Sequence, residues 1–299
     1  MTPRQLNMYF WTFLMWGLSF VWLTKVIATF GWVGGVSFRA AAAVLILLAL
    51  AKVMKVQLQY HPEDTKHFAI LGATSVAMNL GGMTFALSRL GTALTAILVT
   101  TIPLYSALIE RVWGGIKHTK LMILGLWIGF GGVIILIGLS SQQINSNFLL
   151  GFVGSTIASF GFALGGNYSK QKAQHIGAWE QTIGTFTFGA LYLLPFMIVV
   201  PIVKTPTPAS FGWLFLLAGT ASALAYILYF RLVTEIGATK ALTTEFLVPV
   251  VAVIVGVVFL GESITITDLI GAACILLGSS LVLGLLPIKR NTQVELASH

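Results

Sequence analysis

Residues 237–262 read GATKALTTEFLVPVVAVIVGVVFLGE, and residues 91–116 read GTALTAILVTTIPLYSALIERVWGGI. Each stretch opens with a glycine and carries a proline at the same later position, Pro249 in one and Pro103 in the other. The stretches lie 146 residues apart, and the same offset pairs Gly91 with Gly237, Gly31 with Gly177, Gly125 with Gly271, Gly132 with Gly278, and Gly138 with Gly284. Other residues rarely replace the backbone roles of Gly and Pro. This shared register therefore predicts a duplicated unit.

The composition around these stretches is that of a membrane protein. Of the 299 residues, 57% are apolar and 9% are charged, and the mean hydropathy is +0.92. Soluble domains carry roughly 25% charged residues. A bilayer-spanning helix needs about 20 apolar residues. The apolar runs predict ten spans, at residues 6–28, 32–52, 67–88, 92–113, 119–139, 149–170, 179–203, 210–232, 237–259 and 265–287.

The ten spans divide into two units of five, which we expect at residues 1–144 and 145–299. Because five is odd, the second unit enters the membrane from the opposite side. The predicted fold class is an all-α integral membrane protein of two inverted five-helix repeats, an architecture found in secondary transporters. Cytoplasmic loops are enriched in Lys and Arg. Placing both termini in the cytoplasm puts most of the 17 Lys and Arg residues on that side.

Several function classes are disfavoured. The formal net charge of +8 arises mainly from the short loops rather than from a nucleic-acid-binding domain. The single cysteine, Cys274, allows neither an internal disulfide nor a thiolate metal site. No HExxH or Walker A motif is present. We therefore expect no enzyme activity, cofactor, metal or nucleic-acid partner, and transport driven by gradients rather than by ATP.

The repeat motifs carry a family resemblance. The segment 237–242, Pro249 and then Leu260-Gly261-Glu262 are similar to the "G-A-x-x-A … P … l-G-E" pattern of the drug/metabolite transporter superfamily, and in particular of its EamA-type exporters. Residues 16–20, WGLSF, resemble that family's first helix, whereas Ile116 stands where the first repeat would carry the counterpart of Glu262. The resemblance implies a ten-helix bundle in a bacterial cytoplasmic membrane. It also implies a substrate cavity between the halves and export of amino acids, other metabolites or drugs.

Glu245 and Arg39 are the charged residues that lie deepest within predicted spans. Glu245 is one helical turn before Pro249, whose missing N–H frees the carbonyl of Glu245. A carboxylate in a bilayer faces a cavity or a partner. Glu245 is therefore interpreted either as a substrate-binding or proton-coupling group or as a structural partner of Arg39 or Lys240. Arg39 could attract a substrate carboxylate, but snorkelling to the interface or pairing with a helix end is the more ordinary interpretation.

Neutral polar and aromatic residues complete the candidate site. Asn79 is either an inter-helix hydrogen-bonding group or a cavity ligand. Aromatic side chains could form apolar walls, although core packing or lipid contact explains most single aromatics. Pro103 and Pro249 are candidate hinges or static kinks. The residues expected to bind substrate are Trp16, Phe20, Asn79, Tyr168, Tyr226, Tyr229 and Glu245.

These features predict a secondary transporter that exports amino acids by alternating access. Multidrug or organic-cation efflux is the alternative, with Glu245 binding the cation. The expected partners are a small-molecule substrate, the lipid bilayer and protons as a coupling ion, and the expected assembly is a monomer or homodimer. An intramembrane enzyme would need paired polar groups at a catalytic spacing, and the sequence contains none that we identify.

Overall fold

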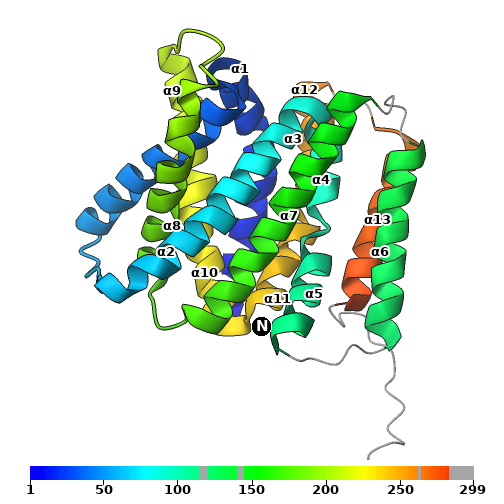
Figure 1. Cartoon of the computed structure of the whole chain (residues 1–299), viewed down its shortest axis with the longest axis horizontal. Helices are drawn as coiled ribbons and strands as arrows, with labels where there is room; N and C mark the ends of the chain where they lie inside the picture. Colours follow the sequence, from blue (N-terminus) through cyan, green and yellow to red (C-terminus); the bar gives the residue numbers. More distant parts are fainter. Residues whose placement is uncertain (115–119, 140–144, 262–263, 283–299) are drawn as a thin grey trace, which may run out of the picture.

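The computed structural model describes residues 1–114, 120–139, 145–261 and 264–282, and this part of the chain is helical without strands (Figure 1). The first half comprises α1 (Pro3–Val53), η1 (Pro62–Asp64), α2 (Thr65–Leu71), η2 (Gly72–Gly81), α3 (Gly82–Leu90), α4 (Thr92–Val99), α5 (Ile102–Gly114) and α6 (Lys120–Leu139). The second half comprises α7 (Ser146–Lys172), α8 (Ala178–Leu193), η3 (Leu194–Ile198), α9 (Pro208–Leu217), η4 (Ala218–Leu224), α10 (Ala225–Ile236), α11 (Ala238–Ala241), η5 (Leu242–Phe246), α12 (Val248–Leu260) and α13 (Ile266–Val282).

The secondary structure repeats at the offset of 146 residues. Element starts and ends recur in the pairs Gly72 and Ala218, Leu90 and Ile236, Thr92 and Ala238, Ile102 and Val248, Gly114 and Leu260, and Lys120 and Ile266. Even the unusual elements recur, because η2 and η4 are both π-helical. The sequence register therefore corresponds to two copies of one helical unit. The exact boundary between residues 144 and 145 stays a prediction, since residues 140–144 lie outside the described part.

Contacts between α6 and α13, which lie side by side (Figure 1), show that the two copies are inverted. A Cβ atom added to Gly132 would lie 2.7 Å from the carbonyl oxygen of Gly271. One added to Gly278 would lie 2.5 Å from the carbonyl oxygen of Gly125. The offset converts each of these contacts into the other, as a two-fold axis requires. Parallel copies would instead bring Gly132 against Gly278, so the two helices run antiparallel.

This close approach gives a stability prediction. We expect Gly278→Ala to lower the free energy of unfolding by about 1–3 kcal/mol, because the new methyl group meets backbone atoms that cannot rotate away. Gly131→Ala is the matched control, since a Cβ atom there meets no atom within 4 Å. Thermal unfolding of the two purified variants in detergent measures the difference. Equal melting temperatures would contradict the packing described here.

Each predicted span overlaps helical segments within the part of the chain that the structure describes. In the described residues six helical stretches are long and apolar enough to cross a membrane. One of them, α1, has 51 residues and contains the first two predicted spans, with a sharp break at Gly31 (φ 70°) in place of the expected loop. The count of ten membrane-crossing helices stays a prediction, as does the cytoplasmic position of both termini. Glu262 and the C-terminal tail lie outside the described residues.

The two proline-containing helices are interrupted rather than smoothly bent. Gly91 (φ 77°) and Gly237 (φ 87°) begin the segments with backbone conformations that L side chains rarely adopt. In the first repeat the α-helix stops at Val99 and resumes at Ile102, and in the second α11 gives way to η5 before α12 begins. Pro103 and Pro249 lie in the first turn of the resumed helices, where a missing N–H leaves no helical bond unmade. Their role as hinges stays a prediction.

Candidate functional site

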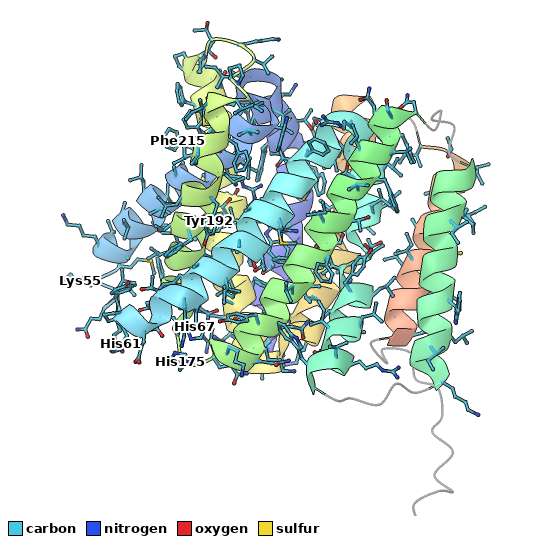
Figure 2. All side chains as sticks on the ribbon, viewed as in Figure 1. Lys55, His61, His67, His175, Tyr192 and Phe215 are labelled. Atoms are coloured by element: carbon cyan, nitrogen blue, oxygen red, sulfur yellow. The ribbon has the colours of Figure 1, made fainter. Side chains whose placement is uncertain are left out.

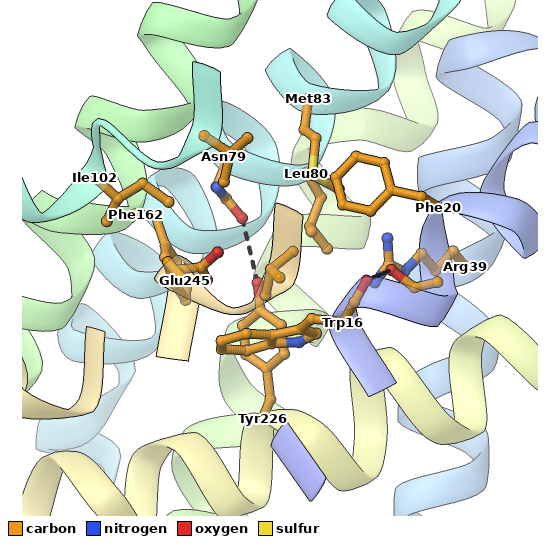
Figure 3. Close-up of a pocket in the computed structure, with 13 residues that line it drawn as sticks. Trp16, Phe20, Arg39, Asn79, Leu80, Met83, Ile102, Phe162, Tyr226 and Glu245 are labelled. Carbon is orange, nitrogen blue, oxygen red and sulfur yellow. Dashed lines mark hydrogen bonds between the residues drawn. The ribbon is translucent and has the colours of Figure 1, made fainter. Parts of the chain in front are cut away.

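A small cavity lies inside the bundle, where both repeats contribute to its wall (Figure 3). Its volume is about 30 Å³, which is room for about two water molecules. An amino acid is larger than this, so the walls must move apart before one could enter. The cavity is lined by Trp16, Ser19, Phe20, Arg39, Asn79, Leu80, Met83, Val99, Ile102, Phe162, Tyr226, Glu245 and Val248.

The lining residues are related by the internal symmetry. Four pairs are separated by the repeat offset, namely Trp16 with Phe162, Leu80 with Tyr226, Val99 with Glu245, and Ile102 with Val248. Equivalent positions of two copies meet only near the axis that relates them. The cavity therefore lies on the pseudo-two-fold axis. Its polar groups break the symmetry, because the second repeat supplies a phenol and a carboxylate where the first supplies leucine and valine.

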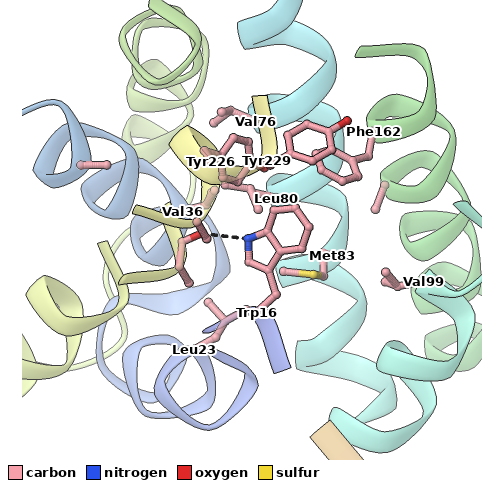
Figure 4. Close-up of a cluster of buried hydrophobic side chains, with 14 of the residues drawn as sticks. Trp16, Leu23, Val36, Val76, Leu80, Met83, Val99, Phe162, Tyr226 and Tyr229 are labelled. Carbon is pink, nitrogen blue, oxygen red and sulfur yellow. Dashed lines mark hydrogen bonds between the residues drawn. The ribbon is translucent and has the colours of Figure 1, made fainter. Parts of the chain in front are cut away.

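Aromatic side chains form one wall of the cavity (Figure 4). The ring of Trp16 lies 5.6 Å from that of Phe162 and 5.8 Å from that of Tyr226, in edge-to-face contacts. Trp16 Nε1 donates to the carbonyl of Ala221 at 3.1 Å, and Tyr226 Oη donates to that of Ser75 at 2.9 Å. These two carbonyls occupy equivalent positions in the π-helical segments. A π-helical turn displaces backbone hydrogen bonds, so its carbonyls can accept from side chains. The two aromatic donors therefore bind the cavity wall to both repeats.

Glu245 brings a carboxylate to the cavity. The residue lies in η5, is 5% exposed and precedes Pro249 by one turn. Within the described residues its carboxylate has no ion pair, so the expected alternative of a salt bridge with Arg39 is not observed. The side chain of Lys240, the other partner considered, lies outside the described part. A charged carboxylate inside a membrane costs at least a few kcal/mol, so this group needs a proton or a cationic ligand.

Arg39 is buried, which differs from the interfacial position that its sequence context favours. Snorkelling to the interface was the preferred interpretation, but the side chain is 1% exposed and lines the cavity. Its Nε donates to Ser222 Oγ at 2.6 Å, and in the described part of the chain Nη1 has no hydrogen-bond partner. Helix α1 continues past Gly31 into the bundle core, which carries Arg39 away from the interface. A guanidinium with unused donors is suited to bind a carboxylate.

Five of the seven predicted binding residues line the cavity: Trp16, Phe20, Asn79, Tyr226 and Glu245. Asn79 makes the expected inter-helix hydrogen bond and also lines the cavity, while its role as a substrate ligand stays a prediction. Its Nδ2 donates to the carbonyl of Ala158 at 3.1 Å, while its Oδ1 lies 3.5 Å from Tyr226 Oη. It therefore links two helices and presents an amide to the cavity.

The other two predicted residues lie elsewhere. Tyr229 is fully buried and stacks on Phe162 with a ring-centre separation of 4.9 Å, so it supports the aromatic wall from behind. Tyr168 is six residues beyond Phe162 on α7, a rise of about 9 Å, and it reaches the end of the bundle. There its Oη lies 2.8 Å from His67 Nδ1. Tyr168 thus does not extend the cavity wall as expected.

Several apolar lining residues were not identified from sequence, among them Leu80, Val99, Ile102 and Val248. Nothing in their side chains distinguishes them from other core residues. The repeat offset distinguishes three of them. It pairs Leu80 with Tyr226 and Val99 with Glu245, which are both candidates, and it pairs Ile102 with the residue before Pro249. Applying the offset to Tyr226 and Glu245 locates Leu80 and Val99, whereas Ile102 and Val248 each precede a candidate proline by one residue.

Comparisons with known proteins agree with this architecture. The EamA-like transporter family matches residues 7–138 and 149–284, one match in each repeat. The uncharacterized transporter YoaV of Bacillus subtilis is 25% identical over 82% of this chain and 84% of its own. The uncharacterized inner membrane transporter YedA of Escherichia coli is 26% identical over 77% of this chain and 74% of its own. A crystal structure with 13% identity superposes with a TM-score of 0.69, covering 95% of this chain and 98% of that one.

Proposed function

The chain belongs to the EamA-like transporter family, and from this premise we propose that it exports amino acids across a bacterial cytoplasmic membrane by alternating access. That it is a multi-pass membrane transporter follows from the family match over both repeats. The proposal concerns the substrate, the direction and the mechanism. It rests on one observation: a cavity on the axis between inverted repeats contains both Arg39 and Glu245.

An amino acid at neutral pH carries one carboxylate and one ammonium group, and the cavity offers a partner for each. The guanidinium of Arg39 has a donor without a partner, and the carboxylate of Glu245 has no ion pair within the described residues. A zwitterion bound between them would satisfy both groups at once. Charged groups that are hydrogen-bonded in this way are the strong contacts of a binding site.

The remaining lining residues favour an apolar side chain on the substrate. Phe20, Leu80, Met83 and Phe162 are buried hydrophobic residues of the cavity wall. Ligand sites typically combine such apolar surface with a few fixed polar groups. We therefore propose that amino acids with aliphatic or aromatic side chains are preferred over charged ones.

Alternating access follows from the inverted symmetry. If the two repeats exchange conformations, the cavity that opens to one side in the first state opens to the other side in the second. The interruptions before Pro103 and Pro249 lie next to the lining residues Ile102 and Val248, so a change of helix angle there would move the wall directly. A proton bound to Glu245 in the absence of substrate would couple transport to the proton gradient.

Efflux of organic cations is the second candidate, and the pairing of Glu245 with aromatic rings favours it. Aromatic faces and a carboxylate together attract cations. Arg39 argues against this function, because its positive charge in the same cavity repels a cation. A cationic substrate would also offer Arg39 no anionic group to bind.

Reconstituted vesicles distinguish the two candidates. We expect proteoliposomes to take up radiolabelled leucine or phenylalanine saturably, and to do so more strongly when a pH gradient is imposed. Tetraphenylphosphonium and glutamate should show no uptake above that of protein-free vesicles. Saturable uptake of the lipophilic cation without amino-acid uptake would support the second candidate, and uptake of neither would contradict both.

A further inference from the structure

A cluster of three metal-ligating side chains lies away from the cavity, at the end of the bundle. Asp64 ends η1, His67 is on α2, and His175 is in the turn between α7 and α8. Figure 2 labels the two histidines, which lie near each other at this end of the bundle. Each side chain offers one ligand atom, and these atoms all lie within 4.8 Å of one another. We propose that Asp64, His67 and His175 bind a divalent transition-metal ion such as Zn²⁺.

The hydrogen bonds of the cluster prepare its ligands. His175 Nε2 lies 2.9 Å from Asp64 Oδ1, so a metal ion would replace the proton that these two groups share. His67 Nδ1 lies 2.8 Å from Tyr168 Oη, which orients the ring and leaves Nε2 for the metal. A second hydrogen bond of this kind accompanies most metal-bound histidines. Tyr168, which does not line the cavity, would thus orient a metal ligand.

The burial of Asp64 is a further reason to expect a cation. Its side chain is 4% exposed, and His175 is its ion-pair partner among the described residues. Carboxylates are rarely buried to this degree without strong pairing. A neutral imidazole supplies a hydrogen bond but no charge, whereas a divalent ion would compensate the carboxylate fully.

The ligand set selects the type of ion. Two imidazoles and one carboxylate are typical of Zn²⁺ and related transition metals, whereas Mg²⁺ and Ca²⁺ prefer oxygen ligands. Metal–ligand bonds of about 2.0–2.2 Å place neighbouring donor atoms roughly 3.3 Å apart in a tetrahedral site. The cluster would contract by about 1 Å or more to reach this spacing. His175 can make that movement because its side chain is 59% exposed.

A metal ion at this position would join the two repeats. Asp64 and His67 belong to the first repeat, whereas Tyr168 and His175 belong to the second. The bound ion would hold η1 and α2 against the α7–α8 turn and so stabilise the arrangement described here. Inhibition of transport by Zn²⁺ is a consequence that rests on the proposed function, because it requires the repeats to move. Binding itself does not depend on that function.

Direct binding tests the site without a transport assay. The full chain, purified in detergent with any polyhistidine tag removed, is titrated with Zn²⁺ against a fluorescent zinc chelator, with Mg²⁺ as the negative control. We expect one Zn²⁺ per chain and a higher melting temperature with Zn²⁺ only. His67→Gln and His175→Gln should each weaken binding by more than about 100-fold. Tyr168→Phe, which removes only the orienting hydrogen bond, should weaken it roughly 10-fold or more.

His61→Gln is the matched control, because His61 is exposed at the same end of the bundle but lies outside the cluster (Figure 2). Its affinity for Zn²⁺ should equal that of the unmodified protein. The proposal is overturned if Zn²⁺ does not bind, since the cluster is then only a hydrogen-bonded contact. It is equally overturned if His67→Gln and His175→Gln bind Zn²⁺ as tightly as His61→Gln, because the ion then sits elsewhere.

Discussion

Replacing Arg39 by glutamine is expected to reduce amino-acid transport by roughly 10- to 100-fold, since a charged hydrogen bond contributes about 1.5–3 kcal/mol. The loss should appear mainly as a higher KM, because the guanidinium would hold the substrate carboxylate in the cavity. The protein itself should remain folded. Arg39 is buried, and Nη1 has no partner in the described structure, so its removal relieves a desolvated charge.

Two comparisons separate recognition of the carboxylate from a general defect. Ser222→Ala removes the hydrogen bond to Nε but keeps the charge, so we expect a smaller loss than for Arg39→Gln. Lys25→Gln removes a positive charge from an exposed position on the same helix and should leave transport unchanged. A primary amine that matches the substrate but lacks its carboxylate should inhibit transport by Arg39→Gln at least as well as transport by the unmodified protein, because the amine is a cation and has no carboxylate for Arg39 to bind. If Arg39→Gln weakened the amine as much as the amino acid, Arg39 would not be the carboxylate-binding group.

The architecture was predictable from sequence because it depends on backbone geometry. Glycines at 91 and 237 adopt a positive φ, and glycines at 132 and 278 allow α6 and α13 to approach closely. No other residue type fills these positions without strain, so their spacing survives in the sequence. The repeat offset and the inverted arrangement could both be inferred from it.

The π-helical segments were not predictable in the same way. Apart from Asn79, residues 72–81 and 218–224 are apolar or small, and such residues fit an α-helix equally well. What accompanies the wider turn is a tertiary contact, in which Trp16 and Tyr226 donate to the carbonyls of Ala221 and Ser75. These partners are distant in sequence, and no local pattern connects them.

Some site residues could likewise be placed from the sequence and others could not. Glu245 was identified because a carboxylate within an apolar span is conspicuous, and it lines the cavity. Arg39 was equally conspicuous, yet its long aliphatic stem allows either snorkelling or burial, and only the path of α1 beyond Gly31 decides between them. Tyr168 is six residues from Phe162, so it lies about 120° around α7 from that ring as well as about 9 Å along the helix, and it does not line the cavity. The position of a residue on its helix can be read from the sequence, whereas its depth in the bundle depends on how the helices pack.

Glu245→Gln is the second change with a large expected effect. It keeps the shape and hydrogen-bonding capacity of the side chain but removes the negative charge. If Glu245 binds the substrate ammonium, transport should fall by roughly 10- to 100-fold for the same energetic reason as at Arg39. If it also carries the coupled proton, the stimulation of uptake by a pH gradient should disappear, because glutamine cannot take up or release a proton in that range.

The two parts of this prediction are measured separately in proteoliposomes. Uptake at fixed pH reports on substrate binding, and the ratio of uptake with and without a pH gradient reports on coupling. Glu63→Gln is the control, since Glu63 is exposed in η1 and does not line the cavity. Transport that is slower but still stimulated by the gradient would retain Glu245 as a binding group and assign the proton to another residue. Transport with unchanged rate and unchanged pH dependence would exclude both roles, and the cavity would then recognise its substrate through Arg39, Asn79 and the aromatic wall alone.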